Sequence, residues 1–111
     1  MEPGAAAERQ AIPLARDEAV RTIRRHEGEL RNRGVVRLAL FGSIARDEAR
    51  HESDVDVVVD IAPGRKFSLI DHGSLRLLFC DMFGREVDVV VRSALRPRFR
   101  DQIARESVPV F

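Results

Sequence analysis

The sequence lacks several features that would place it in a familiar class of protein. Its single cysteine, Cys80, cannot form an internal disulfide and has no partner for a cysteine-ligated zinc site. The longest stretch without Asp, Glu, Lys or Arg runs from Leu38 to Ala45, far short of the roughly 18 apolar residues that a membrane span requires. The first residues have neither a basic start nor an apolar run, so no secretory signal is predicted. We therefore expect a cytoplasmic protein without a membrane segment.

An excess of charge of one sign is also missing. The chain carries 19 basic and 18 acidic residues, a formal net charge of +1. No global field draws such a protein to nucleic acid or to anionic lipid, so neither general nucleic-acid binding nor a membrane partner is expected. With 111 residues, 44% of them hydrophobic and 33% charged, the chain has the size and composition of one soluble globular domain.

The pattern along the chain predicts alternating helices and strands, an α/β class of fold. Residues 1–13 contain two prolines and no burial periodicity and are predicted to form a flexible leader, so that 14–111 make up a single domain. The expected elements are a helix over 15–34, a strand over 35–41, a short helix over 43–50, a strand over 54–61, a helix over 69–83, a strand over 87–91 and a helix that begins at Pro97.

Some boundaries of these elements carry specific signals. Ser68 with Asp71 three residues later is typical of a helix capping box, and Gly84 provides a helix stop. In the last helix Phe99 and Ile103 are expected to face inward. Residues 107–111 are then predicted to form a short apolar tail.

Three aspartates stand where strands should bury apolar side chains. Asp54 and Asp56 are two residues apart, so their side chains leave the same face of the strand with Cα atoms about 7 Å apart. Asp88 lies alone in the aliphatic run 87–91. Like charges at such positions cost stability unless a cation or strong donors neutralise them. If the two strands are neighbours, the three carboxylates converge on one point.

Carboxylates without histidine or cysteine favour Mg²⁺ or Mn²⁺ over zinc. Two such ions about 4 Å apart can align a triphosphate and neutralise a departing pyrophosphate. Gly42 and Ser43 offer a phosphate cradle, since glycine lets the backbone approach an anion and the serine hydroxyl can donate to it. Arg46, one turn further on, adds a charged donor.

Simpler interpretations of the same residues remain open. Asp54 and Asp56 could be solvated residues on an edge strand, and Gly42-Ser43 could be an ordinary strand-to-helix turn with Ser43 as its cap. Asp60 shares the face of the other aspartates but precedes a Pro-Gly turn, which favours a turn-capping role. A further group of arginines is open to two interpretations, a solvated face or a phosphate or partner contact: Arg92, Arg96, Arg98 and Arg100.

The order of these motifs resembles a known family. Gly42-Ser43, ten intervening residues and then Asp54-Val55-Asp56 are similar to the signature of the nucleotidyltransferase superfamily shared with polymerase beta. The longer match, Leu40 to Arg46, then Ser53 to Asp56 and Arg85 to Val90, resembles the minimal nucleotidyltransferases (MNT) of bacteria and archaea. The resemblance covers residues 35–111. One position departs from the family pattern, because Asp47 stands where a glycine usually follows the arginine.

This resemblance implies a small mixed β-sheet with helices packed mainly on one face, and AMP transfer from ATP with two Mg²⁺ ions. It implies metal-ligand and catalytic roles for Asp54, Asp56 and Asp88, with Asp88 also orienting or deprotonating the acceptor. The nucleotide would be bound by Gly42, Ser43, Arg46 and Ser53.

Many members of this family act as antitoxins by transferring AMP to a tyrosine of a HEPN protein, a helical RNase-like toxin. The resemblance therefore implies a HEPN toxin as the partner and a protein hydroxyl as the acceptor. A domain of this size has little room for an acceptor pocket of its own, which agrees with a macromolecular acceptor. An alternative hypothesis is a non-catalytic module that neutralises a toxin by steric occlusion, and self-association of the chain is left open. Retention of all three aspartates favours catalysis, since a pure binder has no use for their repulsion.

Overall fold

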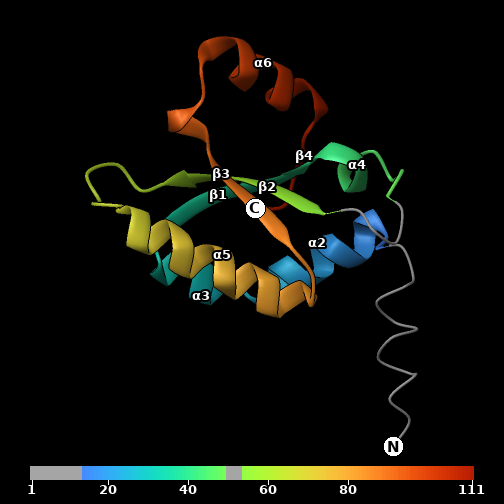
Figure 1. Cartoon of the computed structure of the whole chain (residues 1–111), viewed down its shortest axis with the longest axis horizontal. Helices are drawn as coiled ribbons and strands as arrows, with labels where there is room; N and C mark the ends of the chain where they lie inside the picture. The colour runs from blue at the N-terminus through green and yellow to red at the C-terminus, as the bar shows by residue number, and fades with distance from the viewer. Residues whose placement is uncertain (1–13, 50–53) are drawn as a thin grey trace, which may run out of the picture.

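A four-stranded sheet organises the chain, and the computed structural model describes residues 14–49 and 54–111 (Figure 1). Its strands lie in the order β3-β2-β1-β4. Their bounds are Val35–Phe41 for β1, Val55–Ile61 for β2, Val87–Val91 for β3 and Val108–Pro109 for β4. β2 and β3 are parallel, whereas β1 is antiparallel to both β2 and β4. The expected mixed sheet is confirmed. The predicted leader lies outside the described residues.

Three helices cover one face of this sheet (Figure 1): α2 (Arg16–Arg25), α3 (Glu27–Asn32) and α5 (Leu69–Phe83). The single helix expected over 15–34 is wrong, because the chain turns between α2 and α3 at His26. The His26 Nδ1 atom lies 2.9 Å from the Thr22 carbonyl oxygen at this corner. Ile23 and Leu30 lie on either side of this break, and each is fully buried in the core.

The longest helix, α5, begins and ends as the sequence indicates. The Ser68 hydroxyl accepts a hydrogen bond from the Asp71 amide at 3.1 Å, and the Asp71 carboxylate accepts one from the Ser68 amide at 2.8 Å. Gly84 ends the helix in the left-handed conformation. Because α5 joins β2 to β3 across the face of the sheet, these two strands run parallel.

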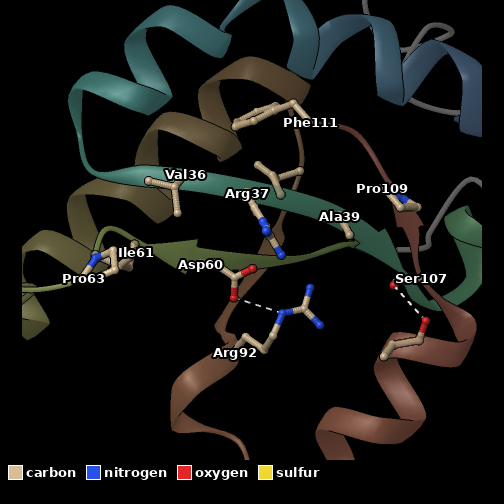
Figure 2. Close-up of a pocket in the computed structure, with 12 residues that line it drawn as sticks. Val36, Arg37, Ala39, Asp60, Ile61, Pro63, Arg92, Ser107, Pro109 and Phe111 are labelled. Carbon is tan, nitrogen blue, oxygen red and sulfur yellow. Dashed lines mark hydrogen bonds and ion pairs between the residues drawn. The ribbon is translucent and has the colours of Figure 1, made fainter.

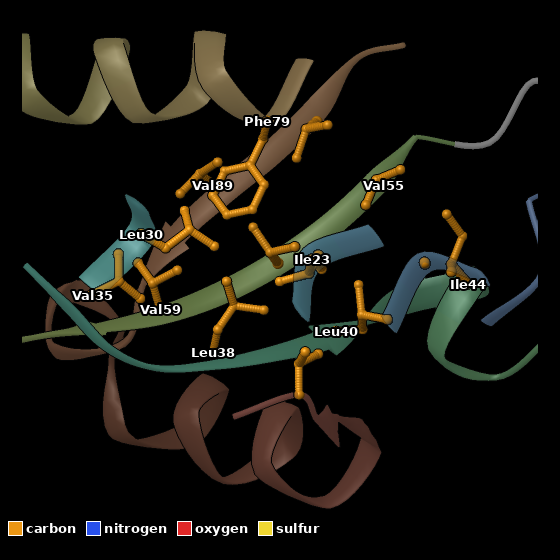
Figure 3. Close-up of a cluster of buried hydrophobic side chains, with 14 of the residues drawn as sticks. Ile23, Leu30, Val35, Leu38, Leu40, Ile44, Val55, Val59, Phe79 and Val89 are labelled. Atoms are coloured by element: carbon orange, nitrogen blue, oxygen red, sulfur yellow. The ribbon is translucent and has the colours of Figure 1, made fainter. Parts of the chain in front are cut away.

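The main core lies between the sheet and these helices (Figure 3). Alternate residues of β2, namely Val55, Val57 and Val59, point into it and are fully buried. The largest of their partners are Phe79 of α5 and Leu38 and Leu40 of β1, each 0–1% exposed. Most of the buried apolar side chains therefore lie on this face of the sheet, while Val58 and its β1 partner Ala39 are buried on the other.

Among residues 14–49 and 54–111, the helix on the opposite face is α6 (Pro97–Glu106), which follows the short helix η1 (Arg92–Ala94) (Figure 1). No residue of α6 is buried, and Phe99 is half exposed, so the expectation that Phe99 faces inward is wrong. The predicted apolar tail pairs with β1 as β4, which places Val110 in the core. Phe111 lies with its ring 4.8 Å from the Arg31 guanidinium carbon.

Within the described residues, no helix combines the length and the apolar character needed to cross a membrane.

Candidate active site

The parallel pairing of β2 and β3 brings two of the three aspartates side by side. Asp56 lies directly opposite Asp88 in the register of these strands. Asp54 is the residue before β2 begins, and alternation along an extended chain puts its side chain on the same face as Asp56. The two strands are thus neighbours, which is the condition that the sequence analysis set for convergence of the carboxylates.

The electrostatics of the cluster centre on Asp56. Its side chain is partly buried, whereas Asp54 and Asp88 are exposed. The pKa of the Asp56 carboxyl is raised from 3.8 to about 6, mainly by burial and then by the negative charges of Asp88 and Asp54, against a smaller lowering by Arg46. Negative charge is therefore concentrated at this edge of the sheet, on a face that lacks the apolar packing of the other.

Gly42 lies against the same carboxylate. Phe41 pairs with Asp56, so the next residue of the chain passes over the Asp56 side chain. Gly42 has a φ of 75°, in the left-handed region, and a Cβ atom at this position would overlap Asp56 Oδ2. Both the backbone conformation and the close approach therefore require glycine.

Ser43 follows in α4 (Gly42–Ala45), which is shorter than the helix expected over 43–50. The helix ends early because Asp47 takes a left-handed φ of 57°. The Asp47 carboxylate accepts a hydrogen bond from the Arg16 amide at 3.2 Å, at the start of α2. The Asp47 carboxylate therefore satisfies a free amide in the first turn of α2.

The remaining expected nucleotide contacts are less defined. Arg46 is exposed, with Nε 3.4 Å from Glu48 Oε2, and its charge lowers the pKa of Asp56. Arg46 thus lies within electrostatic reach of the cluster. Ser53 lies outside the described residues.

The donor set fits a hard divalent cation such as Mg²⁺, since it consists of carboxylate oxygens on neighbouring strands without histidine or thiol groups. Among residues 14–49 and 54–111, no three acidic, imidazole or thiol side chains already surround one point. The backbone thus brings Asp54, Asp56 and Asp88 to one edge, while their side chains do not yet converge.

One feature of this face was missed by sequence reasoning. Asp60 does not cap the turn that follows it. Its Oδ1 atom lies 3.0 Å from Nε of Arg92, and both side chains are about a quarter exposed, at 25% and 28%. Arg92 directly follows Val91, the partner of Val59, so the ion pair continues the β2–β3 register. The pairing of the strands would have indicated it, but neither residue alone does.

Comparisons with known proteins agree with this geometry. Protein adenylyltransferase MntA of Thermococcus cleftensis is 35% identical over 98 residues, which cover 87% of this chain and 97% of that protein. A solved structure of a provisionally assigned minimal nucleotidyltransferase is 40% identical, with a TM-score of 0.68 over 81% of this chain and 94% of the other. The predicted resemblance to the minimal nucleotidyltransferases is confirmed.

A second solved structure shares the fold at low identity. It holds a tri-AMPylated HEPN toxin of Shewanella oneidensis in complex with an MNT antitoxin. The matched chain is 16% identical, with a TM-score of 0.63 over 86% of this chain and 71% of the other. The family model for the nucleotidyltransferase domain matches residues 23–110. By its aspartate pair on adjacent strands, its glycine turn and this match over most of its length, the chain belongs to the nucleotidyltransferase family.

Proposed function

We propose that this nucleotidyltransferase transfers AMP from ATP to a hydroxyl of a partner protein, and that the acceptor is a tyrosine of a HEPN-type toxin that it thereby neutralises. The observation that carries the proposal is the pairing of Asp56 with Asp88 on adjacent strands, directly beneath the close approach of Gly42. The relative named a protein adenylyltransferase supports AMP as the transferred group. The fold shared with an antitoxin bound to an AMPylated toxin supports the partner.

In this proposal Asp54, Asp56 and Asp88 hold Mg²⁺, which supplies charge neutralisation and alignment of the triphosphate. Gly42 and Ser43 bind the phosphates through the backbone and the hydroxyl. The acceptor oxygen forms a bond to the α-phosphorus while the bond to pyrophosphate breaks. Asp88, at the exposed side of the pair, orients the acceptor hydroxyl and takes up its proton.

A second candidate function is neutralisation of a toxin by binding alone. It is favoured by the apolar residues on the outer side of α5, where Leu69, Ile70 and Leu77 are 88%, 83% and 62% exposed. Exposed apolar residues gathered on one element are typical of protein-binding surfaces. Such a surface also serves an enzyme whose substrate is a protein, so the two functions have to be separated by experiment.

The chemistry is tested by incubating the protein with Mg²⁺, ATP labelled in the α-phosphate and a cognate HEPN toxin. Wild type should label the toxin, and Asp54→Asn or Asp56→Asn should reduce the rate by about a hundredfold or more. Asp17→Asn, which removes an exposed carboxylate on α2, is the matched control and should keep full activity. Undiminished labelling by both site variants would refute the assigned metal ligands.

The two functions are separated in cells that express the toxin. If transfer is the mechanism, the double variant Asp54→Asn, Asp56→Asn binds the toxin but no longer protects the cells. Full protection by a variant shown to be inactive in transfer would favour steric neutralisation and overturn the enzymatic proposal.

A further inference from the structure

The outer side of α5 is an apolar surface that no described part of the chain covers. On the side toward the sheet, α5 buries Leu75 and Phe79. On the opposite side Ile70 and Leu77 are 83% and 62% exposed, and their spacing of seven residues places them on one face of the helix. Leu69, in the first turn, is 88% exposed. Apolar side chains aligned in this way are typical of a surface that another protein covers.

The middle of this surface is formed by two small residues. Gly73 lies between Ile70 and Leu77, near the middle of a 15-residue helix, and Ser74 follows it. Glycine makes a helix less stable than alanine does, so a glycine at this position needs a reason. The packing within the described chain offers none, because a Cβ atom on Gly73 would meet no atom within 4 Å. A glycine does, however, let a second helix approach closely.

The two ends of the surface carry unpaired charges of opposite sign. Lys66 stands three residues before α5, and Asp81 lies in its last turn. Both side chains are exposed, and neither makes an ion pair or hydrogen bond with the described residues. They cannot reach each other, because a helix about 22 Å long lies between them. Arg76, at the margin of the surface, is by contrast paired with Glu86.

An antiparallel pair of α5 helices brings these features into contact. In such a pair, residues that are equally far from the crossing point on opposite sides of it lie opposite each other. When two copies cross at residues 73–74, Ile70 lies opposite Leu77 of the second copy. In the same arrangement Lys66 lies opposite Asp81 of the second copy. Because a two-fold axis relates the copies, each contact is made twice. The surface therefore complements itself in its apolar contacts and in its charge.

We propose that the outer face of α5 binds a second copy of this chain as an antiparallel helix pair. Gly73 lets the helices cross closely, and Ile70 and Leu77 form the apolar centre. Lys66 of each copy pairs with Asp81 of the other. A second copy is favoured over a different protein because the opposite charges at the two ends match those of the same surface reversed. This assembly does not depend on AMP transfer. It occupies the surface that otherwise favours neutralisation of a toxin by binding alone.

A dimer of this kind leaves the other side of the sheet open in both copies. The aspartate cluster lies on that side, and so does a groove of about 930 Å³ (Figure 2). Val36, an extra residue at a β-bulge of β1, lines the groove beside Arg37. Asp60 and Arg92 of the groove are already paired with each other. Since no residue of α5 lines the groove or belongs to the cluster, assembly and AMP transfer can be measured independently.

Assembly is measured on the full chain by sedimentation velocity between about 1 µM and about 300 µM. We expect the mass to rise from 12.5 kDa toward twice that value, with a dissociation constant on the order of 10 µM, because one helix pair is smaller than a standard interface. Leu77→Glu puts a carboxylate at the apolar centre and should weaken the dimer at least about tenfold. Gly73→Leu should do the same by holding the helices apart, and the fold is kept because a Cβ there meets no neighbouring atom.

The register of the helix pair is tested by exchanging the end charges. At low ionic strength Lys66→Glu alone and Asp81→Lys alone each set like charges opposite each other and should weaken the dimer about fivefold. An equal mixture of these two variants should dimerise as tightly as wild type, because each altered end then faces the opposite charge on the other copy. Arg21→Glu and Asp101→Lys make the same charge changes at exposed positions outside α5, and neither these variants nor their mixture should differ from wild type.

Other results would overturn the proposal. A mass of 12.5 kDa at every concentration would do so, and so would a dimer unaffected by Leu77→Glu and Gly73→Leu. If the wild type alone is a monomer and Leu77→Glu loses binding of a HEPN toxin, the face belongs to the toxin instead of a second copy. A mixture of Lys66→Glu and Asp81→Lys that dimerises no more tightly than either alone would refute the antiparallel register. If the wild type dimerises as expected but labels no toxin, the assembly stands and the proposed function fails.

Discussion

The two faces of the sheet are built from the same strands and serve different ends. On one face Val55, Val57 and Val59 are fully buried beneath three helices. On the other, the intervening positions carry Asp56 and Asp60 on either side of Val58, which is fully buried, while α6, the helix on this side, has no buried residue. Because side chains alternate along a strand, neighbouring residues can take different roles, one buried in the core and the next presenting a charge on the open face. Stability is concentrated on one face, and charge and open space on the other.

The difference between the two faces is tested most severely by placing a charged side chain on the core face of β2 and an apolar one on the open face. Val57→Asp places a carboxylate in the main core and should destabilise the fold by about 4 kcal/mol or more, enough to leave much of a small domain unfolded. Asp56→Val, one residue away, should fold normally and lose transfer. Urea denaturation followed by circular dichroism measures both.

The size control for this exchange is Val57→Ala, which removes apolar volume without adding charge. It should cost about 2 kcal/mol. If Val57→Asp is no less stable than Val57→Ala, or if Asp56→Val unfolds, the assignment of stability to one face and chemistry to the other is wrong.

One sequence pattern predicted both the buried face of β2 and its functional face. Alternation of Val with Asp over 54–61 predicts both the strand and the side of it that is functional. The capping box at Ser68 and the stop at Gly84 are local signals, and the structure contains both. The parallel pairing that sets Asp56 beside Asp88 was not predicted, because strand order depends on contacts that are distant in sequence; the family resemblance implied only a mixed sheet and a common role for the aspartates.

A second test of the difference between the faces is to neutralise the aspartate cluster with a bound cation and to measure the change in stability. Mg²⁺ that binds the folded cluster and not the unfolded chain should stabilise by about 2.7 kcal/mol at a hundred times its dissociation constant, or roughly 10 °C in melting temperature. A non-hydrolysable ATP analogue should add to this only when Mg²⁺ is present. Melting curves with EDTA, with Mg²⁺ and with both ligands test this, and identical curves in all three would contradict a shared cation site.

A smaller effect is expected at the junction of the two faces, where β1 ends at Gly42. Gly42→Ala puts a Cβ into the Asp56 carboxylate and forces a left-handed φ on alanine. The variant should lose about 1–2 kcal/mol of stability and most of its transfer activity. Gly28→Ala is the matched control, because a Cβ at Gly28 meets no neighbouring atom. Equal activity of the two variants would show that the close approach of Gly42 is not needed.

The features that the sequence did not reveal depend on packing between distant segments. The helix breaks at His26, although Ile23 and Leu30 on either side of the break keep the seven-residue spacing of a single buried helix face. The bulge at Val36 is visible only once β1 is aligned against β2. The exposure of Phe99 reflects a helix that stands over a groove instead of packing on the sheet. None of these has a local signature.

The finest difference between the faces concerns pH. In the folded chain burial, and then the charges of Asp88 and Asp54, raise the pKa of Asp56 from the ordinary 3.8 to about 6. Between these values the folded state holds a proton that the unfolded state has released, so the free energy of unfolding falls as pH rises and levels off above pH 6. Asp56→Asn has no such carboxyl, so its free energy of unfolding should not fall over this pH range.

In EDTA the Asp56→Asn variant should therefore melt close to wild type near pH 4 and above it by a few degrees at pH 7. Asp101→Asn removes an exposed carboxylate from α6 and controls for a general effect of charge. With Mg²⁺ the order should reverse, because the variant has lost a ligand oxygen and its charge. A melting-temperature difference that does not grow with pH in EDTA would mean that Asp56 is not held as a strained charge on the open face.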